Sequence, residues 1–278
     1  MMKSLKNRKI KSKIMVVLTV IATLTALIPL FSIFGYVIMK GLPALNLGFF
    51  INTPTPPGVE GGGIANAIIG TFTLILIASI IGIPVGLMSG IFLSEYGRNR
   101  LGKSISFLTD ILIGVPSIVV GIVVYTLLVI SMGGFTAIAG GVALAFIMIP
   151  AVTRTTEEML KLIPSDIREA GLALGLPKWR VILFIVLPSA MRGIVTGIML
   201  AVARVSGETA PLLFTAFGNI YFSRTLLEPM ASIPVQVFNY AISPYADWKA
   251  QAWAGALVLI LLILVLNVSA RFLTRSRA

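Results

Sequence analysis

The sequence predicts an all-α polytopic membrane protein with six transmembrane helices and both termini in the cytoplasm. Hydrophobic residues make up 57% of the chain and charged residues only 12%, whereas a soluble domain carries about a quarter charged residues. The mean hydropathy is +1.01. Six apolar segments are separated by polar loops, and each approaches the roughly 20 residues that a helix needs to cross a bilayer.

The predicted spans, in chain order, are Ile14–Met39, Ile64–Leu93, Ile105–Ile130, Phe135–Val152, Ile194–Phe217 and Ala252–Ala270. The first is too long for the apolar region of a signal peptide, and further spans follow it, so we expect it to be retained. In the second span, Gly82, Gly86 and Gly90 recur every four residues, a spacing that lets helices approach closely in lipid. Packing alone explains this stripe, and a pivot during transport is the alternative. Pro84 and Pro116 predict kinks.

The positions of the basic residues predict the topology. Lysine and arginine gather in the N-terminal tail, the loop at 98–103, the segment 154–192 and the C-terminal tail, and the intervening loops carry only Lys40, Arg224 and Lys249. With six spans, all the basic segments fall on one side, which the positive-inside rule makes cytoplasmic. The net charge of +12 is therefore a consequence of the topology, and for this membrane protein we expect contact with membrane lipid and no nucleic-acid partner.

The chain divides into two predicted parts. Residues 1–63 form a basic tail, the first span and an external loop rich in proline and glycine, and residues 64–278 form a five-helix core with a cytoplasmic hairpin at about 157–190. A second external loop, Gly218–Lys249, is long enough that we expect it to fold back on the membrane or to meet a partner. Within it, Ile233–Phe238 is expected at the membrane interface.

The chain has no cysteine and no histidine, which excludes disulfides, zinc sites built from these residues, and catalysis by either. The segment Gly97–Ser104 matches the phosphate-binding pattern G-x-x-x-x-G-K-[ST] letter for letter. That pattern works between a strand and a helix, but here two membrane spans flank it. We expect a short basic turn, and any ATP to be bound by another subunit.

The charged segment from Arg154 to Arg192 is the most informative part of the chain. It holds four acidic and six basic residues. Its sequence predicts a helix from Asp166 to Leu174, capped by Ser165 or Asp166. Gly175 suits the left-handed turn that ends a helix, and Pro177 suits the start of the next one. The result is a helical hairpin that either presents its small residues to a soluble partner or lies at the membrane interface.

This hairpin resembles the signature of ABC importer permeases, E-A-A-x(3)-G-x(9)-I-x-L-P. Glu169, Ala170, Gly175, Ile185, Leu187 and Pro188 match it, and Gly171 replaces the third small residue. The resemblance implies the type I importer permease (MetI-like) fold. It also implies that a coupling helix, with Gly171, Leu172 and Ala173 on it, docks into a groove on an ATPase subunit.

Three further segments narrow the resemblance to the phosphate-uptake permeases, in the form of the A-type (PstA) family: Gly63–Thr71, Leu93–Gly97 and Ser206–Leu213. The resemblance implies transport rather than an enzyme activity, in a prokaryotic cytoplasmic membrane. The implied partners are a homologous permease subunit, two ATPase subunits that hold ATP and magnesium, and an external phosphate-binding protein. No cofactor is expected in this chain. The alternatives are the sister subunit, a sulfate or molybdate permease, or a secondary transporter that needs no ATPase.

Arg204 and Glu208 are charged residues within the fifth predicted span, where charges are costly and usually functional. Their spacing of four predicts that they share a helix face and can pair. Two interpretations remain open, a structural ion pair and a place on the anion path. In the second, Arg204 grips phosphate oxygens and Glu208 competes with the anion. Asp110, near the start of the third span, is given no role.

Overall fold

A computed structural model describes residues 2–59 and 61–275, and every regular element in this part is helical. Of the basic terminal residues behind the predicted topology, Arg277 lies outside the described part. The elements are α1 (Met2–Gly41), η1 (Leu42–Ala44), α2 (Leu47–Ile51), α3 (Ala65–Tyr96), α4 (Arg100–Gly114), α5 (Ser117–Val124), η2 (Tyr125–Val129), α6 (Ile130–Met132), α7 (Ala137–Lys161), α8 (Ser165–Ala173), α9 (Lys178–Val181), η3 (Ile182–Val186), α10 (Leu187–Ser206), α11 (Ala210–Thr215), α12 (Ile233–Ala241) and α13 (Ala246–Arg275).

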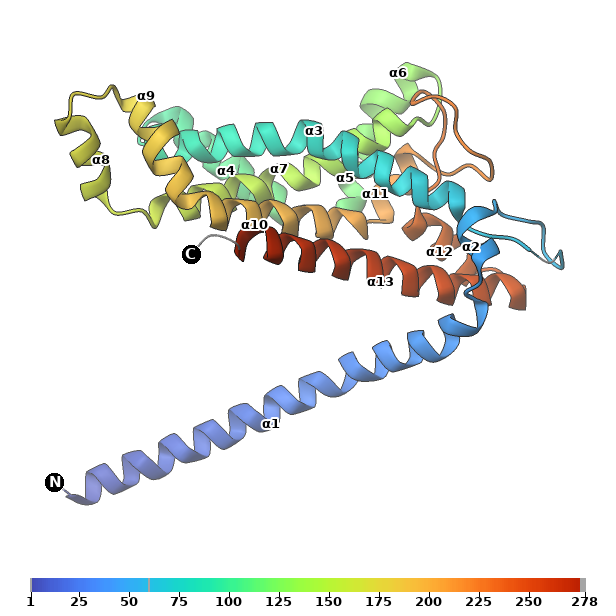
Figure 1. Ribbon diagram of the computed structural model, residues 1–278, viewed down its shortest axis with the longest axis horizontal. Coiled ribbons are helices and arrows are strands. Elements are labelled where there is room, and N and C mark those ends of the chain that lie inside the picture. Colours follow the sequence, from blue (N-terminus) through green and yellow to red (C-terminus); the bar gives the residue numbers. More distant parts are fainter. Residues whose placement is uncertain (1, 60, 276–278) are drawn as a thin grey trace.

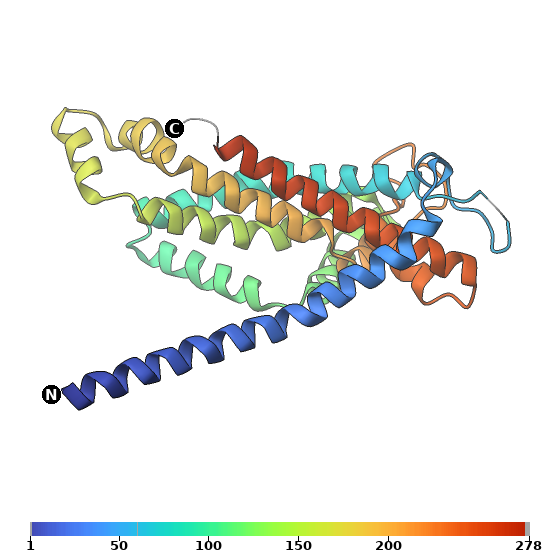
Figure 2. The same cartoon turned by 60° about the horizontal axis from the view of Figure 1, so that its bottom comes forward.

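The long helices form a bundle from which α1 diverges. Figures 1 and 2 show α3, α7, α10 and α13 running side by side, while α1 meets the bundle only near its C-terminal end. There the ring of Tyr36 packs edge-on against Trp253 of α13, with centroids 5.1 Å apart. The N-terminus, the α8–α9 hairpin and the end of α13 lie at the same end of the molecule. We call it the hairpin end, and this arrangement agrees with the predicted topology.

Among the described residues, five helices are long and apolar enough to cross a membrane. The sixth predicted span is a broken one, because α4 and the segment from α5 to α6 meet at an angle of 107°. The break lies at Pro116, whose ring restricts Val115 to extended backbone (ψ 129°) and which has no amide proton to donate to a continuing helix. The kink predicted at Pro116 is thus a full bend, whereas α3 continues through Pro84.

Two predicted span boundaries are wrong. The fourth span, predicted to end at Val152, continues as α7 to Lys161. Its last turns stay helical despite their charges because those charges pair with one another and with α4. The fifth, predicted as Ile194–Phe217, is the continuous helix Lys178–Ser206. It starts early because the second arm of the hairpin runs directly into it, and it ends before Gly207.

The core of the bundle is the contact between α3 and α7, and the glycine stripe of α3 lies in it. A Cβ atom added at Gly86 would lie 2.7 Å from Cβ of Val152, and one at Gly90 would lie 2.5 Å from Cβ of Thr156. Only glycine permits the two backbones to approach this closely. The packing interpretation of the stripe is therefore confirmed, and a pivoting role remains untested.

The end opposite the hairpin is closed by short helices. Phe49 of α2 and Ile233 of α12 are almost fully buried in one apolar cluster with the start of α3 and with α13. The long loop after α11 therefore folds back on the protein itself, which neither of the two expectations, contact with the membrane or with a partner, had anticipated. The expectation that Ile233–Phe238 lies at the membrane interface is wrong for its first residues, because Ile233–Gln236 are buried within the protein.

Candidate functional site

The hairpin has the geometry that the sequence predicts, with one error in its capping. Helix α8 covers Ser165–Ala173, and Pro164 precedes it. Neither Ser165 nor Asp166 caps the backbone with its side chain, although Asp166 does lie in the first turn. Pro164, whose ring locks φ, precedes the helix with extended backbone (ψ 145°), so Ser165 is already the first helical residue.

The turn of the hairpin is closed by a Schellman motif. Gly175 has φ of +80°, a conformation that other residues adopt at a cost. Its amide donates to the carbonyl of Leu172 at 2.9 Å, and the amide of Leu176 donates to that of Gly171 at 3.4 Å. The chain then reverses through Pro177, and α9 continues through η3 into α10. The hairpin therefore leads directly into a membrane-spanning helix.

The inner face of α8 packs against this second arm through Gly171, which is buried. A Cβ atom at this position would lie 3.0 Å from Cγ2 of Val181 and 3.2 Å from Cδ1 of Ile185. The glycine therefore allows a tighter hairpin than the alanine of the signature would. Of the other matched positions in the second arm, Ile185 and Leu187 are half-buried and Pro188 is exposed.

The outer face of α8 is exposed and contains most of the predicted coupling residues: Glu169, Ala170, Leu172 and Ala173. Leu174 follows with 80% of its surface exposed, which is high for a leucine. Figure 1 shows α8 at the outer edge of the hairpin end, away from the helical bundle. An apolar residue between small ones on a projecting helix suits a groove on another protein.

An ion pair that the sequence analysis missed fixes the hairpin to the bundle. Arg168 of α8 contacts Glu95 of α3 in fork geometry, with Nη2 2.7 Å from Oε1 and Nε 3.2 Å from Oε2. The same guanidinium donates to the carbonyls of Leu160 and Ile163 at the end of α7, at 2.8 and 2.7 Å. The Glu95 side chain is 4% exposed. One arginine thus joins α3, α7 and α8.

A lysine strengthens the same junction. Lys178 Nζ donates to the carbonyl of Glu95 at 2.6 Å and lies 4.1 Å from the ring centroid of Tyr96. Glu95 and Tyr96 belong to the segment Leu93–Gly97 that the sequence analysis noted for its resemblance only. The signal that could have indicated the role of Glu95 is an acidic residue at the end of an apolar span, since a carboxylate buried there needs a charged partner.

Asp110 also has a role that the sequence analysis did not assign. It forms an ion pair with Arg154 of α7, whose Nη2 also donates to Oγ of Ser106 at 2.8 Å. Arg154 Nη1 lies 2.6 Å from Oε2 of the buried Glu157, and Lys161 Nζ lies 2.6 Å from its Oε1. These charges join α4 to α7 on the side of the Pro116 bend that faces the hairpin. They make the hairpin end one connected unit.

The predicted pairing of Arg204 with Glu208 is wrong. Arg204 lies in the last turn of α10, but the helix ends at Ser206, and Glu208 lies in the break before α11. The two residues therefore do not share a helix face, and neither forms an ion pair with any described residue. Arg204 is exposed and Glu208 half-buried in the single chain. The helix ends here because Pro211 cannot donate a hydrogen bond to a continuing helix.

The segment Gly97–Ser104 forms no phosphate-binding loop, as expected. Helix α3 precedes it and α4 follows, and Asn99 caps α4 by accepting a hydrogen bond from the amide of Gly102 at 2.8 Å. No strand lies in the described part of the chain, so the context that a nucleotide-binding loop requires is missing.

The fold and the projecting hairpin define a transport component. The family model described as the inner membrane component of binding-protein-dependent transport systems matches residues 82–278. The chain therefore belongs to this family. It is 48% identical over 265 residues to the phosphate transport system permease protein PstA of Yersinia pestis, with 95% of this chain and 90% of that protein covered. The probable PstA of Methanocaldococcus jannaschii is 37% identical, with 95% and 94% covered. Within the wider family, the chain belongs to the PstA permeases.

Solved structures confirm the predicted fold. A chain of the MetNI methionine ABC transporter in an inward-facing conformation matches with a TM-score of 0.60 at 17% identity, over 77% of this chain and 94% of that one. A chain of a bacterial ABC transporter that imports the acidic polysaccharide alginate matches with a TM-score of 0.61 at 14% identity, over 91% and 95%. The type I permease architecture and the multi-pass membrane class are therefore correct, and the relatives are named as permeases rather than enzymes.

Proposed function

We propose that this chain is the membrane-spanning permease subunit of an ATP-driven importer of inorganic phosphate and forms half of its translocation path. The observation that carries the proposal is the hairpin, whose outer face is exposed while Arg168 ties its inner side to Glu95. The names of the relatives, phosphate transport system permease proteins, support phosphate as the substrate.

The proposed assembly has four kinds of partner. A homologous permease subunit supplies the other half of the path, two ATPase subunits bind ATP and magnesium, and a phosphate-binding protein delivers the anion from outside. The chain itself holds no cofactor and lies in the cytoplasmic membrane of a prokaryotic cell, with the hairpin end inside. The family description, which names a dependence on a binding protein, supports the external partner.

The coupling step follows from the contacts at the hairpin end. When the ATPases close on ATP, they move α8, which carries Glu169 and Ala170 on its outer face and is followed directly by the exposed Leu174. Arg168 passes this motion to α3 and α7, since its side chain bonds to both. The close packing of α3 against α7 at Gly86 and Gly90 makes the two helices move together. ATP shifts the equilibrium because it binds only one of the two arrangements tightly.

Arg204 is the residue that we assign to the anion path. It lies at the end of an apolar helix, is exposed in the single chain and has no ion-pair partner among the described residues. A guanidinium in this position attracts an anion and can bond two of its oxygens at once. Glu208 lies four residues further along, beyond the helix end, and its carboxylate accepts a hydrogen bond from protonated phosphate while repelling a fully ionised oxyanion.

A co-purification experiment tests the assembly. The tagged chain is expressed with the genes of its chromosomal neighbours and purified in detergent beside Gly175→Pro, which cannot adopt the φ of +80° found there. We expect the native chain, and not the variant, to bring down an ATPase. Gly175→Asn is the matched control, because asparagine tolerates this conformation. A folded native chain that brings down no ATPase would contradict the proposal.

Uptake measurements separate the alternatives. Vesicles containing the assembled importer should take up labelled phosphate only with ATP, and unlabelled phosphate should compete while sulfate and molybdate do not. Competition by sulfate or molybdate would assign another oxyanion. Uptake that survives deletion of the ATPase would indicate a secondary transporter instead.

A further inference from the structure

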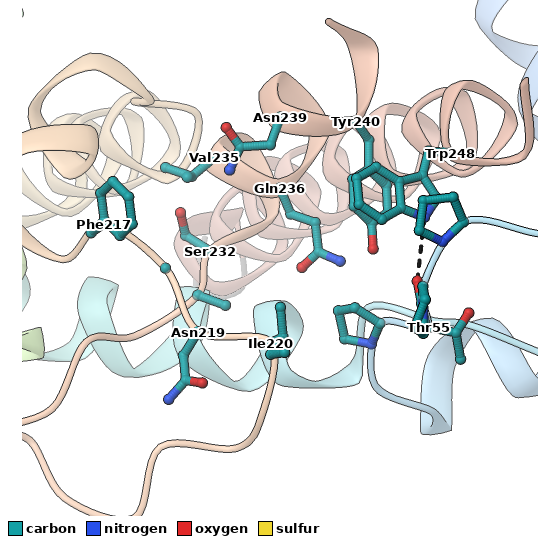
Figure 3. A pocket seen from close by; sticks show the side chains of 15 residues that line it. Thr55, Phe217, Asn219, Ile220, Ser232, Val235, Gln236, Asn239, Tyr240 and Trp248 are labelled. Atoms are coloured by element: carbon teal, nitrogen blue, oxygen red, sulfur yellow. Dashed lines mark hydrogen bonds between the residues drawn. The ribbon is translucent and has the colours of Figure 1, made fainter. Parts of the chain in front are cut away.

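A cavity of about 380 Å³ opens at the end of the molecule opposite the hairpin. Its walls are the proline-rich segment 54–57, the loop 217–220, one face of α12, and Trp248 at the start of α13 (Figure 3). None of the residues that line it is charged. Its size, and its apolar walls with a few polar groups, are those of a binding pocket.

Side chains of α12 bring unpaired polar atoms to this cavity. Gln236 Nε2 and the hydroxyl of Tyr240 have no hydrogen-bond partner, and the residues are only 8% and 6% exposed. Figure 3 shows both side chains pointing from α12 into the same space, toward the side of Ile220 and Thr55. Ser232, which directly precedes α12, has an unpaired buried hydroxyl as well. Native proteins pair nearly all such atoms, so these mark a place where something binds.

Unpaired polar atoms are concentrated at this end of the protein. Of the six found among buried side chains of the described residues, five lie here: those of Asn66, Ser232, Gln236, Tyr240 and Gln251. Burial raises the pKa of the Tyr240 hydroxyl, and the adjacent Gln236 side chain offsets part of that rise; the group keeps its proton and remains a hydrogen-bond donor. The two donors that face the cavity, an amide and a hydroxyl, are therefore both neutral.

The chemistry of the walls restricts what can bind. An anion such as inorganic phosphate would lose its hydration in a cavity that offers no charged residue in return. A lipid acyl chain would fill the apolar space but leave Gln236 and Tyr240 unpaired, at a cost. An uncharged group with a carbonyl oxygen and apolar flanks satisfies both requirements, and a peptide backbone bearing apolar side chains is such a group.

The chain itself already binds a peptide segment on this surface. Trp248 Nε1 donates to the backbone carbonyl of Thr55 at 3.3 Å, and Asp247 Oδ2 accepts from the amide of Gly58 at 2.8 Å. The rings of Tyr240 and Trp248 are stacked with centroids 4.7 Å apart. Aromatic surfaces with such donors recognise extended, proline-rich backbone. The segment 54–57 occupies the Trp248 side of the surface, and the donors of α12 remain free for a second segment.

The opposite rim of the cavity is strained. Phe217 has φ of +60°, which is unfavourable for a bulky residue, and its ring stacks on Phe135 at 4.9 Å while 54% of its surface stays exposed. Backbone strain of this kind is concentrated where proteins bind other groups. The rim is therefore held in a fixed shape before any partner arrives.

We infer that this cavity receives an uncharged peptide segment of the external binding protein, whose backbone carbonyl accepts hydrogen bonds from the Gln236 amide and the Tyr240 hydroxyl. The inference rests on the proposed function, because it assigns the partner from the family's dependence on a binding protein. It adds the place on the permease where that partner inserts and the chemistry that recognises it.

Affinity measurements on the complete importer in nanodiscs test the hydrogen bonds. Purified binding protein is titrated onto the native complex and onto complexes with Gln236→Leu or Tyr240→Phe, which remove a donor and keep the apolar volume. Each variant should weaken binding roughly threefold to tenfold, the effect of one neutral hydrogen bond. Gln251→Leu is the matched control, since it removes a buried unpaired amide at the same end but outside the cavity, and it should bind like the native complex.

Photocrosslinking tests the location without depending on these buried positions. The crosslinker p-benzoylphenylalanine replaces Ile220 or Asn239, which are exposed and line the cavity, or the exposed Tyr221 and Phe238, which do not line it. The first pair should form adducts with one uncharged segment of the binding protein, located by mass spectrometry. Adducts at the second pair only, or with lipid only, would overturn the inference.

The two proposals fail in different ways. If the native complex imports phosphate and binds the binding protein, but Gln236→Leu and Tyr240→Phe bind equally well, only the cavity's assignment is wrong. If the native complex neither imports phosphate nor binds the external protein, the proposed function is wrong, and the inference falls with it.

Discussion

Arg168 and Glu95 lie 73 residues apart in the sequence and form a two-point ion pair at the hairpin end, with Nη2 2.7 Å from Oε1. The carboxylate comes from the last turn of α3 and the guanidinium from the middle of α8. The guanidinium of Arg168 also donates to the carbonyl of Leu160, in the last turn of α7, and to that of Ile163, just beyond this helix. The position of α8 is therefore determined by two other helices at once.

The first prediction concerns this pair. Glu95→Gln should leave the complex assembled and the ATPase active, but should lower phosphate uptake per ATP hydrolysed by roughly tenfold, since a coupling loss of about 1.4 kcal/mol has that effect. The physical reason is that Arg168 loses its charged partner while it keeps its carbonyl acceptors, so α8 follows α3 less closely. ATP hydrolysis and phosphate uptake are measured on the same vesicles.

Arg98→Gln is the control for this prediction, because Arg98 is exposed, lines the same cavity as Glu95 and Arg168, and forms no ion pair with a described residue. It should leave the ratio of uptake to hydrolysis unchanged. In a double-mutant cycle, Glu95→Gln and Arg168→Gln should cost much less together than the sum of their separate effects. Additive losses would mean that the pair does not transmit the motion.

The second prediction concerns the stripe of glycines on α3. In an ordinary helix, Gly→Ala is stabilising, but Gly86→Ala places a methyl group 2.7 Å from Cβ of Val152. We expect it to lower the free energy of unfolding by about 1–3 kcal/mol, the usual cost of overpacking. Gly114→Ala is the matched control: its Cβ would meet no atom within 4 Å, so it should be neutral or stabilise by up to about 1 kcal/mol. Thermal unfolding in detergent measures both, and equal midpoints would refute the packing argument.

The elements that the sequence predicted well are those that depend on local chemistry. The turn at Gly175 and the restart after Pro177 follow from the preferences of single residues, and both lie as predicted. The bend at Pro116 follows in the same way, although its size of 107° does not. A proline removes one donor and restricts its neighbour, but the angle that results depends on what α5 packs against.

The elements that the sequence analysis missed depend on packing between distant segments. Nothing local connects Asp110 with Arg154, or Glu95 with Arg168, because each pair is brought together only when α4 and α8 close on the bundle. The error at Arg204 has a different cause. A run of apolar residues continues through the end of α10, so hydropathy does not register the break at Gly207.

The third prediction concerns Arg204. Arg204→Gln should abolish phosphate uptake, while the permease and ATPase still co-purify, because the guanidinium is the only part of the side chain that bonds the anion. Arg204→Lys should retain part of the activity with weaker discrimination, since an ammonium keeps the charge but loses the two-point geometry. Lys249→Gln, which removes an exposed cation near the start of α13, is the control and should transport normally. Normal uptake by Arg204→Gln would remove this residue from the anion path.

The fourth prediction separates the two faces of α8. Leu174 is 80% exposed, so Leu174→Ser should leave the stability of the isolated permease unchanged. If the ATPase covers this side chain, the variant loses about 1.5–3 kcal/mol of burial, and the affinity for the ATPase falls by tenfold or more. Gly171→Val should instead lower the stability of the isolated permease, because the valine side chain would clash with Val181 and Ile185 inside the hairpin. That variant should unfold at a lower temperature and lose ATPase binding only as the hairpin itself loosens.

Binding of purified ATPase to immobilised permease, measured beside thermal unfolding, distinguishes these outcomes. For Leu174→Ser, native stability with weakened binding indicates that the exposed face of α8 is the docking surface. Native binding by the same variant would contradict that assignment, because a leucine buried by a partner contributes to affinity in proportion to the area it covers. The contrast is informative because Gly171 is buried against Val181 and Ile185, whereas Leu174, just past the end of the same short helix, is 80% exposed.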